Sequence, residues 1–561
     1  MSLKQQLLPT VLLLLLAFLA LYPLMLLLLY SFQISSPGVD PVWSLQGWRD
    51  AFASPGIRQA LWNTITIAIV TQSIAVVVGV ALAWLLARTD IPGRNWLETG
   101  CWLAFFLPTL PVLLGWVLLM DPRFGVLNQL ATSVPGVSAA PFNIFSWWGI
   151  VWAHLVTGAI AVKVVLLVPA FRNLDSSLEE ASRSCGVSVA GTFRRIVLPL
   201  IMPAILVVSL MSLVVALQSF EIELTLGTRA RIDVFSTMIY KFIRSEPGNI
   251  PAATALSTLI VAVMLPLVAL QYRYIQRRRN ATVSGRMRTS VTHLGRWRWP
   301  AFGLVVGFLV VSMVLPLALL VTGTFMKLFG VFELENPFTL RNWAAAVDDS
   351  LFLGALKDTV LLGFGNAAIA IGVLPLIAYI IVRTRYALRG ALDFLSWLPW
   401  ALPGIIMSLG ILWMVLSMPI LRPLHATIWV LLIAVAIGTL TVGVQMYKTT
   451  LSQVRVDMEE AARISGGSWA YAYRRVLLPV MTPAMVAVGV VAFVFAARDV
   501  SRIALLAGSE TRPLALLQLD FIVNDQFEVS AVIGVIIVAL TFGVALVSRV
   551  IGLRLGIMQS N

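Results

Sequence analysis

The chain has 561 residues, of which 59% are hydrophobic and 12% are charged, and its mean hydropathy is +0.92. Soluble domains are nearer half apolar, with about a quarter of their residues charged, so this composition excludes an ordinary soluble enzyme. A net charge of +14 would suggest nucleic acid for a soluble protein, but basic residues in a membrane protein gather in loops on the inner side. We therefore expect a lipid bilayer around this chain and no nucleic acid.

Twelve apolar blocks are long enough to cross a bilayer, which takes roughly 20 residues. They must be helices, because the hydrocarbon core offers no partner to an open strand edge. In chain order they cover residues 7–34, 59–86, 97–120, 147–171, 196–218, 252–275, 302–326, 353–382, 391–417, 427–450, 474–495 and 530–549. The first block exceeds the core of a secretory signal, and we expect it to remain as a span.

The two halves of the chain follow one plan. Arg88 recurs 295 residues later as Arg383, and Glu180 recurs as Glu460 at an offset of 280. The offset falls because the stretch 121–146 is longer than its counterpart in the second half. Exposed loops tolerate such insertions. Six spans in each half give both halves one orientation, a parallel repeat. The expected fold is an all-α membrane protein with about twelve transmembrane helices, built from lobes at residues 1–275 and 301–561 and a basic cytosolic linker at 276–300.

One segment is repeated more closely than the rest of the chain. Residues 178–204 and 458–484 align without gaps and share thirteen of 27 positions. Each copy predicts a short polar helix, a glycine, a second short helix and a basic pair at the foot of a span. Gly186 and Gly466 permit a turn that a Cβ would resist. In each short helix an acidic and a basic residue lie three apart, which allows an ion pair on one face.

Two matching loops indicate that a symmetric dimer of a soluble partner meets both lobes. The run Glu180-Ala181-Ser182, Gly186 and Leu198-Pro199, with its second copy, resembles the EAA motif of permeases in type I ABC importers. We name residues 178–199 the first EAA loop and residues 458–479 the second EAA loop.

The resemblance implies that each EAA loop forms a coupling helix that docks on an ATP-binding cassette subunit, two copies of which dimerise on ATP. It assigns coupling to Glu179, Glu180, Ala181, Arg183, Gly186, Glu459, Glu460, Ala461, Arg463 and Gly466. It also implies a periplasmic or lipid-anchored solute-binding protein on the opposite face, and a bacterial inner-membrane location with both termini cytoplasmic. The fused format resembles ferric-iron-type permeases, and thiamine and phosphonate permeases look similar.

The chain has no sequence for cradling nucleotide phosphates. A P-loop needs a Gly-Lys-Ser/Thr turn, and none of the six lysines follows a glycine. The chain is therefore expected not to be an enzyme: it has no catalytic residues and no cofactor of its own, and ATP and Mg²⁺ bind the partner subunit. A secondary transporter would not need twin docking loops, and a membrane enzyme would need clustered acids or histidines.

Polar residues inside or beside the spans are candidates for the substrate path. The ends of the fifth spans carry Gln218, Glu221, Glu223, Arg498 and Asp499. The three carboxylates could give a cation a hard-oxygen waypoint, or the segment could be a solvated loop that meets the binding protein.

Several other residues carry simpler expectations. Lys163 is expected to snorkel to the inner surface and His154 to pack with its polar atoms satisfied. Asn63 and Asp358 are expected to cap the helices that they begin. Cys101 and Cys185 are expected to be packing residues, and prolines at 108, 111, 399 and 403 to break the third and ninth spans.

Overall fold

The computed structural model describes residues 3–34, 40–175, 177–278, 291–331 and 334–554. Regular structure in these residues is helical apart from three isolated bridges. Ten helices are long and apolar enough to cross a membrane, and two pairs of helices bend by 98° and 112° at a short break. Counting each bent pair as one span gives twelve, so the expected fold class is confirmed.

The spans of the two lobes correspond one to one. The first lobe contains α1 (Leu3–Tyr30), α3 (Ile57–Arg88), the bent pair α4 (Arg94–Phe106) and α5 (Thr109–Met120), α7 to α8 (Trp147–Arg172), α10 to α11 (Val189–Ala216) and α14 (Ile250–Arg278). The second contains α15 to α16 (Gly295–Thr324), α18 to α19 (Phe352–Arg383), the bent pair α20 (Arg389–Trp397) and α21 (Gly404–Ser417), α22 (Ile428–Gln453), α24 to α25 (Trp469–Arg498) and α27 (Phe527–Arg554).

Short helices connect the spans. Those of the EAA loops are α9 (Ser177–Ser184) and α23 (Asp457–Ile464). At the other ends of the spans lie α2 (Gln46–Ala53), α6 (Val126–Thr132), α13 (Phe235–Arg244), α17 (Arg341–Asp348) and α26 (Leu514–Val523).

The third span of each lobe bends where proline dictates it. Leu107 and Leu402, which precede Pro108 and Pro403, have extended backbone angles, because the proline ring disfavours the helical region for the residue before it. A bend leaves helix-end carbonyls without partners, and within a membrane these must be satisfied by the protein. The expected breaks are therefore confirmed at Pro108 and Pro403, whereas Pro111 lies in the first turn of α5 and Pro399 in a 3₁₀ turn at residues 398–401. At each bend the free carbonyls need hydrogen-bond donors from elsewhere in the protein.

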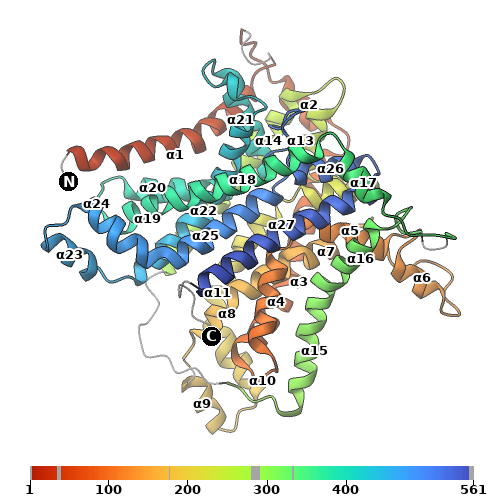
Figure 1. Ribbon diagram of the computed structural model, residues 1–561, viewed down its shortest axis with the longest axis horizontal. Coiled ribbons are helices and arrows are strands. Elements are labelled where there is room, and N and C mark those ends of the chain that lie inside the picture. The colour runs from red at the N-terminus through yellow and green to blue at the C-terminus, as the bar shows by residue number, and fades with distance from the viewer. Residues whose placement is uncertain (1–2, 35–39, 176, 279–290, 332–333, 555–561) are drawn as a thin grey trace.

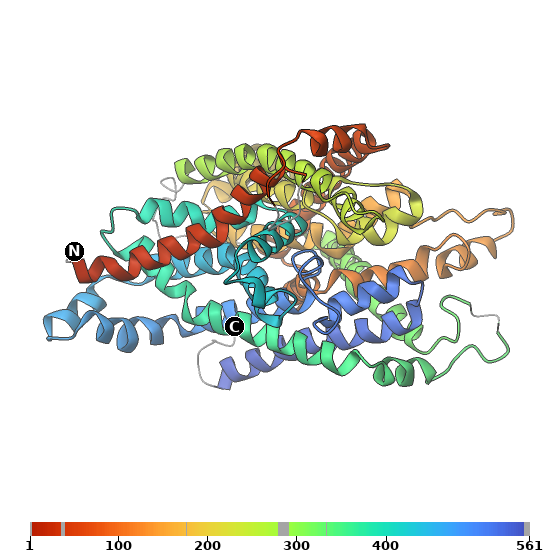
Figure 2. The ribbon, with the colours of Figure 1, turned by 90° about the horizontal axis from the view of Figure 1, so that it is seen from above.

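The first span of each lobe packs on the bent span of the other lobe. Helix α1 contacts α21, and α16 contacts α5. A Cβ at Gly115 of α5 would lie 2.1 Å from the carbonyl oxygen of Pro316, and one at Gly410 of α21 would lie 3.0 Å from Pro23 Cβ. Glycine at these two equivalent positions lets the helices cross closely, so the lobes are interlocked rather than merely adjacent (Figures 1 and 2).

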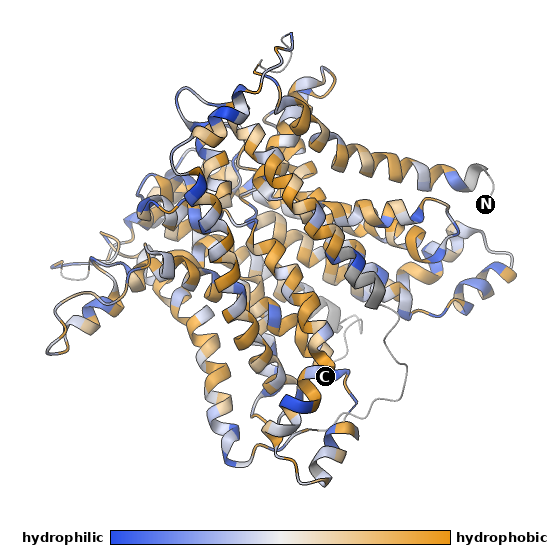
Figure 3. Ribbon diagram, turned by 180° about the vertical axis from the view of Figure 1, so that it is seen from behind, coloured by the Kyte–Doolittle hydropathy of each residue, from blue (hydrophilic) through white to orange (hydrophobic). Residues whose placement is uncertain are grey.

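The two EAA loops lie at the ends of separate arms. In Figure 1, α23 and α24 end the arm that contains α19, α22 and α25, whereas α9 and α10 end the arm that contains α3, α4 and α8. The arms converge toward α2, α13, α17 and α26. Apolar residues run along the helices, with hydrophilic residues toward the ends of the arms (Figure 3).

The expected linker falls mostly on residues 279–290, which lie outside the described residues. Its far end is fixed to the first lobe, because Thr292 N donates to Arg88 O (2.8 Å) and Leu294 N donates to Asp90 Oδ1 (2.9 Å). The Leu294 amide, aided by His293, holds the pKa of the Asp90 carboxyl below its usual range. The end of the linker thus attaches beside the end of α3 that carries Arg88.

Four expectations about single residues are wrong. Lys163 does not snorkel: it is fully buried, and its Nζ donates to Gln72 Oε1 (2.5 Å) and Ala159 O (3.1 Å). Asn63 and Asp358 lie inside α3 and α18, because both helices begin about two turns before these residues. Cys101 is buried as expected, but Cys185 is exposed.

Candidate functional site: the EAA loops and the lobe interface

The first EAA loop is held on its own lobe by a buried ion pair. Glu179 in α9 pairs with Arg88 at the end of α3, and the two side chains are 5% and 1% exposed. Arg88 Nε donates to Glu179 Oε1 (3.1 Å) and its Nη1 donates to Leu174 O (3.2 Å). Because the pair is buried, removing either partner should destabilise the loop, since the remaining charge would lose its compensating partner.

The second EAA loop is held differently at the equivalent place. Glu459 is 7% exposed and accepts a hydrogen bond from the Tyr379 hydroxyl. Arg383, the counterpart of Arg88, instead donates to the carbonyls of Leu451 (2.9 Å) and Val454 (2.5 Å). Val454 is the counterpart of Leu174 at an offset of 280. Both arginines therefore cap the fourth span, but only Arg88 also binds an EAA glutamate.

Aromatic side chains pack against one another between the second EAA loop and α19. Tyr379 contacts Trp469 and Tyr473 edge to face at 5.8 and 5.6 Å, and those two rings stack at 5.5 Å. In the first lobe the corresponding contact is the single pair Trp84 and Phe193, at 5.0 Å. The two loops thus share a backbone plan but rest on different chemistry.

The next residues of each motif face outward. Glu180, Ala181, Glu460, Ala461 and Arg463 are all exposed. The side chain of Arg183 lies outside the described residues, and among the described ion pairs none joins Glu460 to Arg463. The two adjacent glutamates of each loop therefore differ in exposure: Glu179 and Glu459 are buried, whereas Glu180 and Glu460 are exposed.

The glycines do make the turn that the sequence predicts. Gly186 has φ +76° and Gly466 has φ +83°, and nothing lies within 4 Å of a Cβ placed at either. The left-handed backbone alone therefore demands glycine. After each turn a serine begins the next helix: Ser188 Oγ accepts from Gly191 N and Ser468 Oγ accepts from Tyr471 N, both at 3.2 Å.

Gly186→Ala and Gly466→Ala should each destabilise their loop by about 1–2 kcal/mol, the cost of a left-handed non-glycine residue. Hydrogen exchange in the flanking helix should quicken about tenfold, because local opening governs exchange. Gly303→Ala in α15 is the matched control, since it too has open space around it but an ordinary helical backbone. Unchanged exchange in both loop variants would contradict the assignment.

The residues expected at the substrate path are buried or half-buried, so they do not lie in a solvated loop. Glu223 is 2% and Asp499 is 7% exposed. Glu223 Oε1 lies 2.8 Å from His154 Nε2, and its Oε2 accepts from Ser219 Oγ (2.5 Å), so His154 is satisfied as expected. Asp499 accepts from the backbone N (2.9 Å) and Nη1 (2.5 Å) of Arg502.

In the described part of the chain no group of three His, Cys, Asp or Glu side chains could hold a metal ion, so the three carboxylates of the suggested hard-oxygen waypoint do not come together in this structure. Glu221 instead faces Asp499, Arg498 and Arg502 of the other lobe. The residues form two separate groups because Glu223 turns toward His154 in its own lobe, whereas Glu221 turns across the lobe interface.

The ends of the fifth spans bind the bends of the third spans across the lobe interface. Arg498 Nη1 donates to Leu107 O (2.9 Å), where α4 stops before α5. Gln218, its counterpart at an offset of 280, donates from Nε2 to Trp400 O (2.9 Å) at the bend of the second lobe. Each lobe therefore supplies a donor to carbonyls that the proline bend of the other lobe leaves free.

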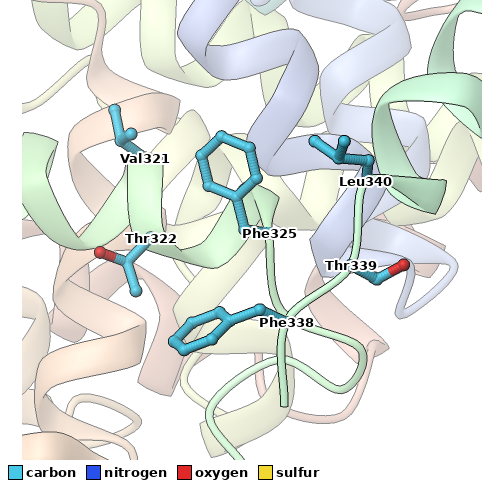
Figure 4. A pocket seen from close by; sticks show the side chains of 6 residues that line it. All are labelled: Val321, Thr322, Phe325, Phe338, Thr339 and Leu340. Atoms are coloured by element: carbon cyan, nitrogen blue, oxygen red, sulfur yellow. The ribbon is translucent and has the colours of Figure 1, made fainter. Parts of the chain in front are cut away.

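Sequence reasoning named Gln218 and Arg498 but not their partners. The available signal was that Gln218 and Arg498 share an offset of 280, while the two Leu-Pro bends, at Leu107 and Leu402, share an offset of 295. An open pocket of about 610 Å³ lies elsewhere, at the end of α16, and is lined by Val321, Thr322, Phe325, Phe338, Thr339 and Leu340 (Figure 4). No charged side chain is among its lining residues.

These features define an integral membrane protein of two fused lobes, each of which presents one EAA loop at the end of an arm. The profile of the binding-protein-dependent transport system inner membrane component matches residues 75–281 and 375–556, one match in each lobe and more than half of the chain. The chain therefore belongs to this family, and it is a membrane-embedded permease component of an ABC importer.

Curated relatives extend over both lobes. A probable ABC transporter permease protein of Sinorhizobium fredii is 26% identical over 88% of this chain and 87% of its own length. A putative ferric transport system permease protein of Haemophilus influenzae is 26% identical over 87% of this chain and 78% of its own length. A sulfate transport system permease protein of Salmonella typhimurium is 29% identical over 41% of this chain and 82% of its own length.

Proposed function

We propose that this chain forms the translocation pathway of an importer for ferric iron and takes its energy from two separate ATP-binding subunits, one at each EAA loop. Both termini would be cytoplasmic in a bacterial inner membrane, and a periplasmic or lipid-anchored solute-binding protein would deliver substrate to the opposite face. ATP and Mg²⁺ would bind the partner subunits, and this chain would catalyse no reaction.

The observation that carries the coupling role is the exposure of Glu180 and Glu460 at equivalent places. Each lies beside a buried glutamate that fixes its helix to the end of α3 or α19. A force applied to α9 or α23 would therefore be transmitted directly to a membrane span. A symmetric pair of ATPases suits this arrangement, because equivalent surfaces meet equivalent surfaces.

The support for ferric iron is the two-lobe match to a relative named for ferric transport. The relative named for sulfate transport matches only part of the chain. The test is uptake of radioactive ferric iron into proteoliposomes that contain the complex and its binding protein, compared with sulfate, thiamine and a phosphonate. ATP-dependent uptake of iron alone supports the proposal; uptake of another solute alone overturns the substrate while leaving the permease role intact.

For the pathway itself, we propose that it is closed at the lobe interface beside Glu221, Glu223, Arg498 and Asp499. Gln218 and Arg498 hold the third-span bends of the opposite lobe, so separating the lobes here would strip hydrogen bonds from carbonyls at membrane depth. Such separation becomes favourable only if water or substrate replaces those donors. The buried charges at this place would then be exposed as the pathway opens.

In the double variant Gln218→Cys with Trp400→Cys, a short bifunctional thiol reagent should join the two lobes. The rate of transport should then fall more than tenfold, because the lobes can no longer separate there. Each variant that carries just one of the two substitutions, treated in the same way, is the control for reaction at the natural Cys101 and Cys185. Full transport by cross-linked protein would show that the pathway opens elsewhere.

A further inference from the structure

The outward faces of the two EAA loops are not equivalent in apolar surface. Within the described part of the first loop, the large exposed apolar side chain is Leu178, at 48%. The second loop exposes Met458 (45%), Ile464 (86%), Trp469 (40%) and Tyr471 (55%). The same backbone plan therefore presents a mainly polar surface in one lobe and a partly apolar one in the other.

Ile464 is the clearest difference between the loops. It lies one helical turn beyond Glu460 in α23, so both side chains share one face of the helix, and both are exposed. The counterpart of Ile464 in α9 is Ser184, one turn beyond the exposed Glu180. The acidic contact is thus common to both loops, whereas the apolar contact exists only in the second.

The surroundings of Ile464 favour a protein over a lipid surface. On the exposed surface of helix α23, Asp457 pairs with Arg455 (2.6 Å), and Glu460 and Arg463 have opposite charges. The helix therefore offers no basic cluster of the kind that binds the negatively charged inner leaflet. The basic pair Arg474 and Arg475 stands at the foot of the next span, which is where head groups are expected. Ile464 lies on the other side of that pair along the chain, toward the tip of the arm.

Resting on the proposed coupling role, we infer that the second EAA loop is the tighter of the two docking sites for the ATP-binding subunits. Glu460 would meet a basic group of the partner, and Ile464 would enter an apolar pocket beside it. The same partner bound at the first loop meets Ser184 and leaves that pocket unfilled. Two identical ATP-binding subunits would therefore bind one permease with unequal affinities.

Exchanging the two residues tests this inference. Ile464→Ser makes the two equivalent positions polar in both loops, and Ser184→Ile makes them apolar in both loops. Both positions are exposed, so neither change disturbs packing. Binding of the ATP-binding subunit to the full chain in lipid nanodiscs would be measured without nucleotide, so that the subunits do not dimerise on ATP. Ile464→Val is the conservative control, and thermal unfolding of each variant checks its fold.

We expect the natural chain to bind one subunit about tenfold to a hundredfold more tightly than the second, the range that corresponds to burial of one isoleucine. Ile464→Ser should abolish the tight class, and Ser184→Ile should create a second tight site. Equal affinities in the natural chain, or an unchanged tight class in Ile464→Ser, would overturn the inference. Failure of the natural chain to bind any ATP-binding subunit would instead refute the proposed function.

Discussion

Arg88→Met should loosen the first EAA loop by about 3–5 kcal/mol, the cost of removing one partner of a buried ion pair. Glu179 would lose its Arg88 partner while its side chain, only 5% exposed, stays buried. Hydrogen exchange in residues 177–192 should quicken about a hundredfold or more, because exchange follows the free energy of local opening. Labelling of the exposed Cys185 gives a second, independent measure of the loop.

Two controls separate this effect from simple loss of an arginine. Arg88→Met combined with Glu179→Met should recover most of the lost stability, because apolar residues of similar size often replace a buried pair at little cost. Arg383→Met in the second lobe should cost less, since Arg383 caps backbone carbonyls while Tyr379 binds Glu459. Equal losses in Arg88→Met and Arg383→Met would show that the ion pair contributes nothing beyond the cap.

Reversing the outward charges of both EAA loops should abolish ATP-driven transport while the spans stay inserted. Glu180→Lys with Glu460→Lys changes two exposed side chains, and we expect the loss to lie in docking. Repulsion in place of a charged hydrogen bond at each site would weaken binding of the ATP-binding subunits by more than a hundredfold. The measurements are substrate uptake and ATP hydrolysis in proteoliposomes.

A matched pair of charge reversals tests whether position or net charge is responsible. Glu335→Lys with Glu510→Lys makes the same change at exposed positions in loops away from the EAA loops. That control should still bind the ATP-binding subunits with unchanged affinity. If the EAA variant transports as well as the natural chain, Glu180 and Glu460 do not couple the two proteins.

The order of spans and the duplicated plan followed from the sequence, because hydrophobic length and repeat offsets are properties of the chain alone. The twelve expected blocks agree with the helices to within several residues, and the prolines marked both bends. The turns at Gly186 and Gly466 were equally predictable, since a left-handed backbone favours glycine whatever the neighbouring helices are. The local plan of each EAA loop could therefore be read without any knowledge of its neighbours.

Only the tertiary structure decided which way each charge faces. Glu179 and Glu180 are adjacent and chemically identical, yet one is bound to Arg88, 91 residues earlier, and the other is exposed. In the same way, Arg498 was expected on the substrate path or in a solvated loop but bonds to Leu107, 391 residues earlier. Lys163 was expected to snorkel to the inner surface but is buried. Such partners are chosen by how helices distant in sequence pack, because a polar group at membrane depth takes whichever donor or acceptor the fold brings to it.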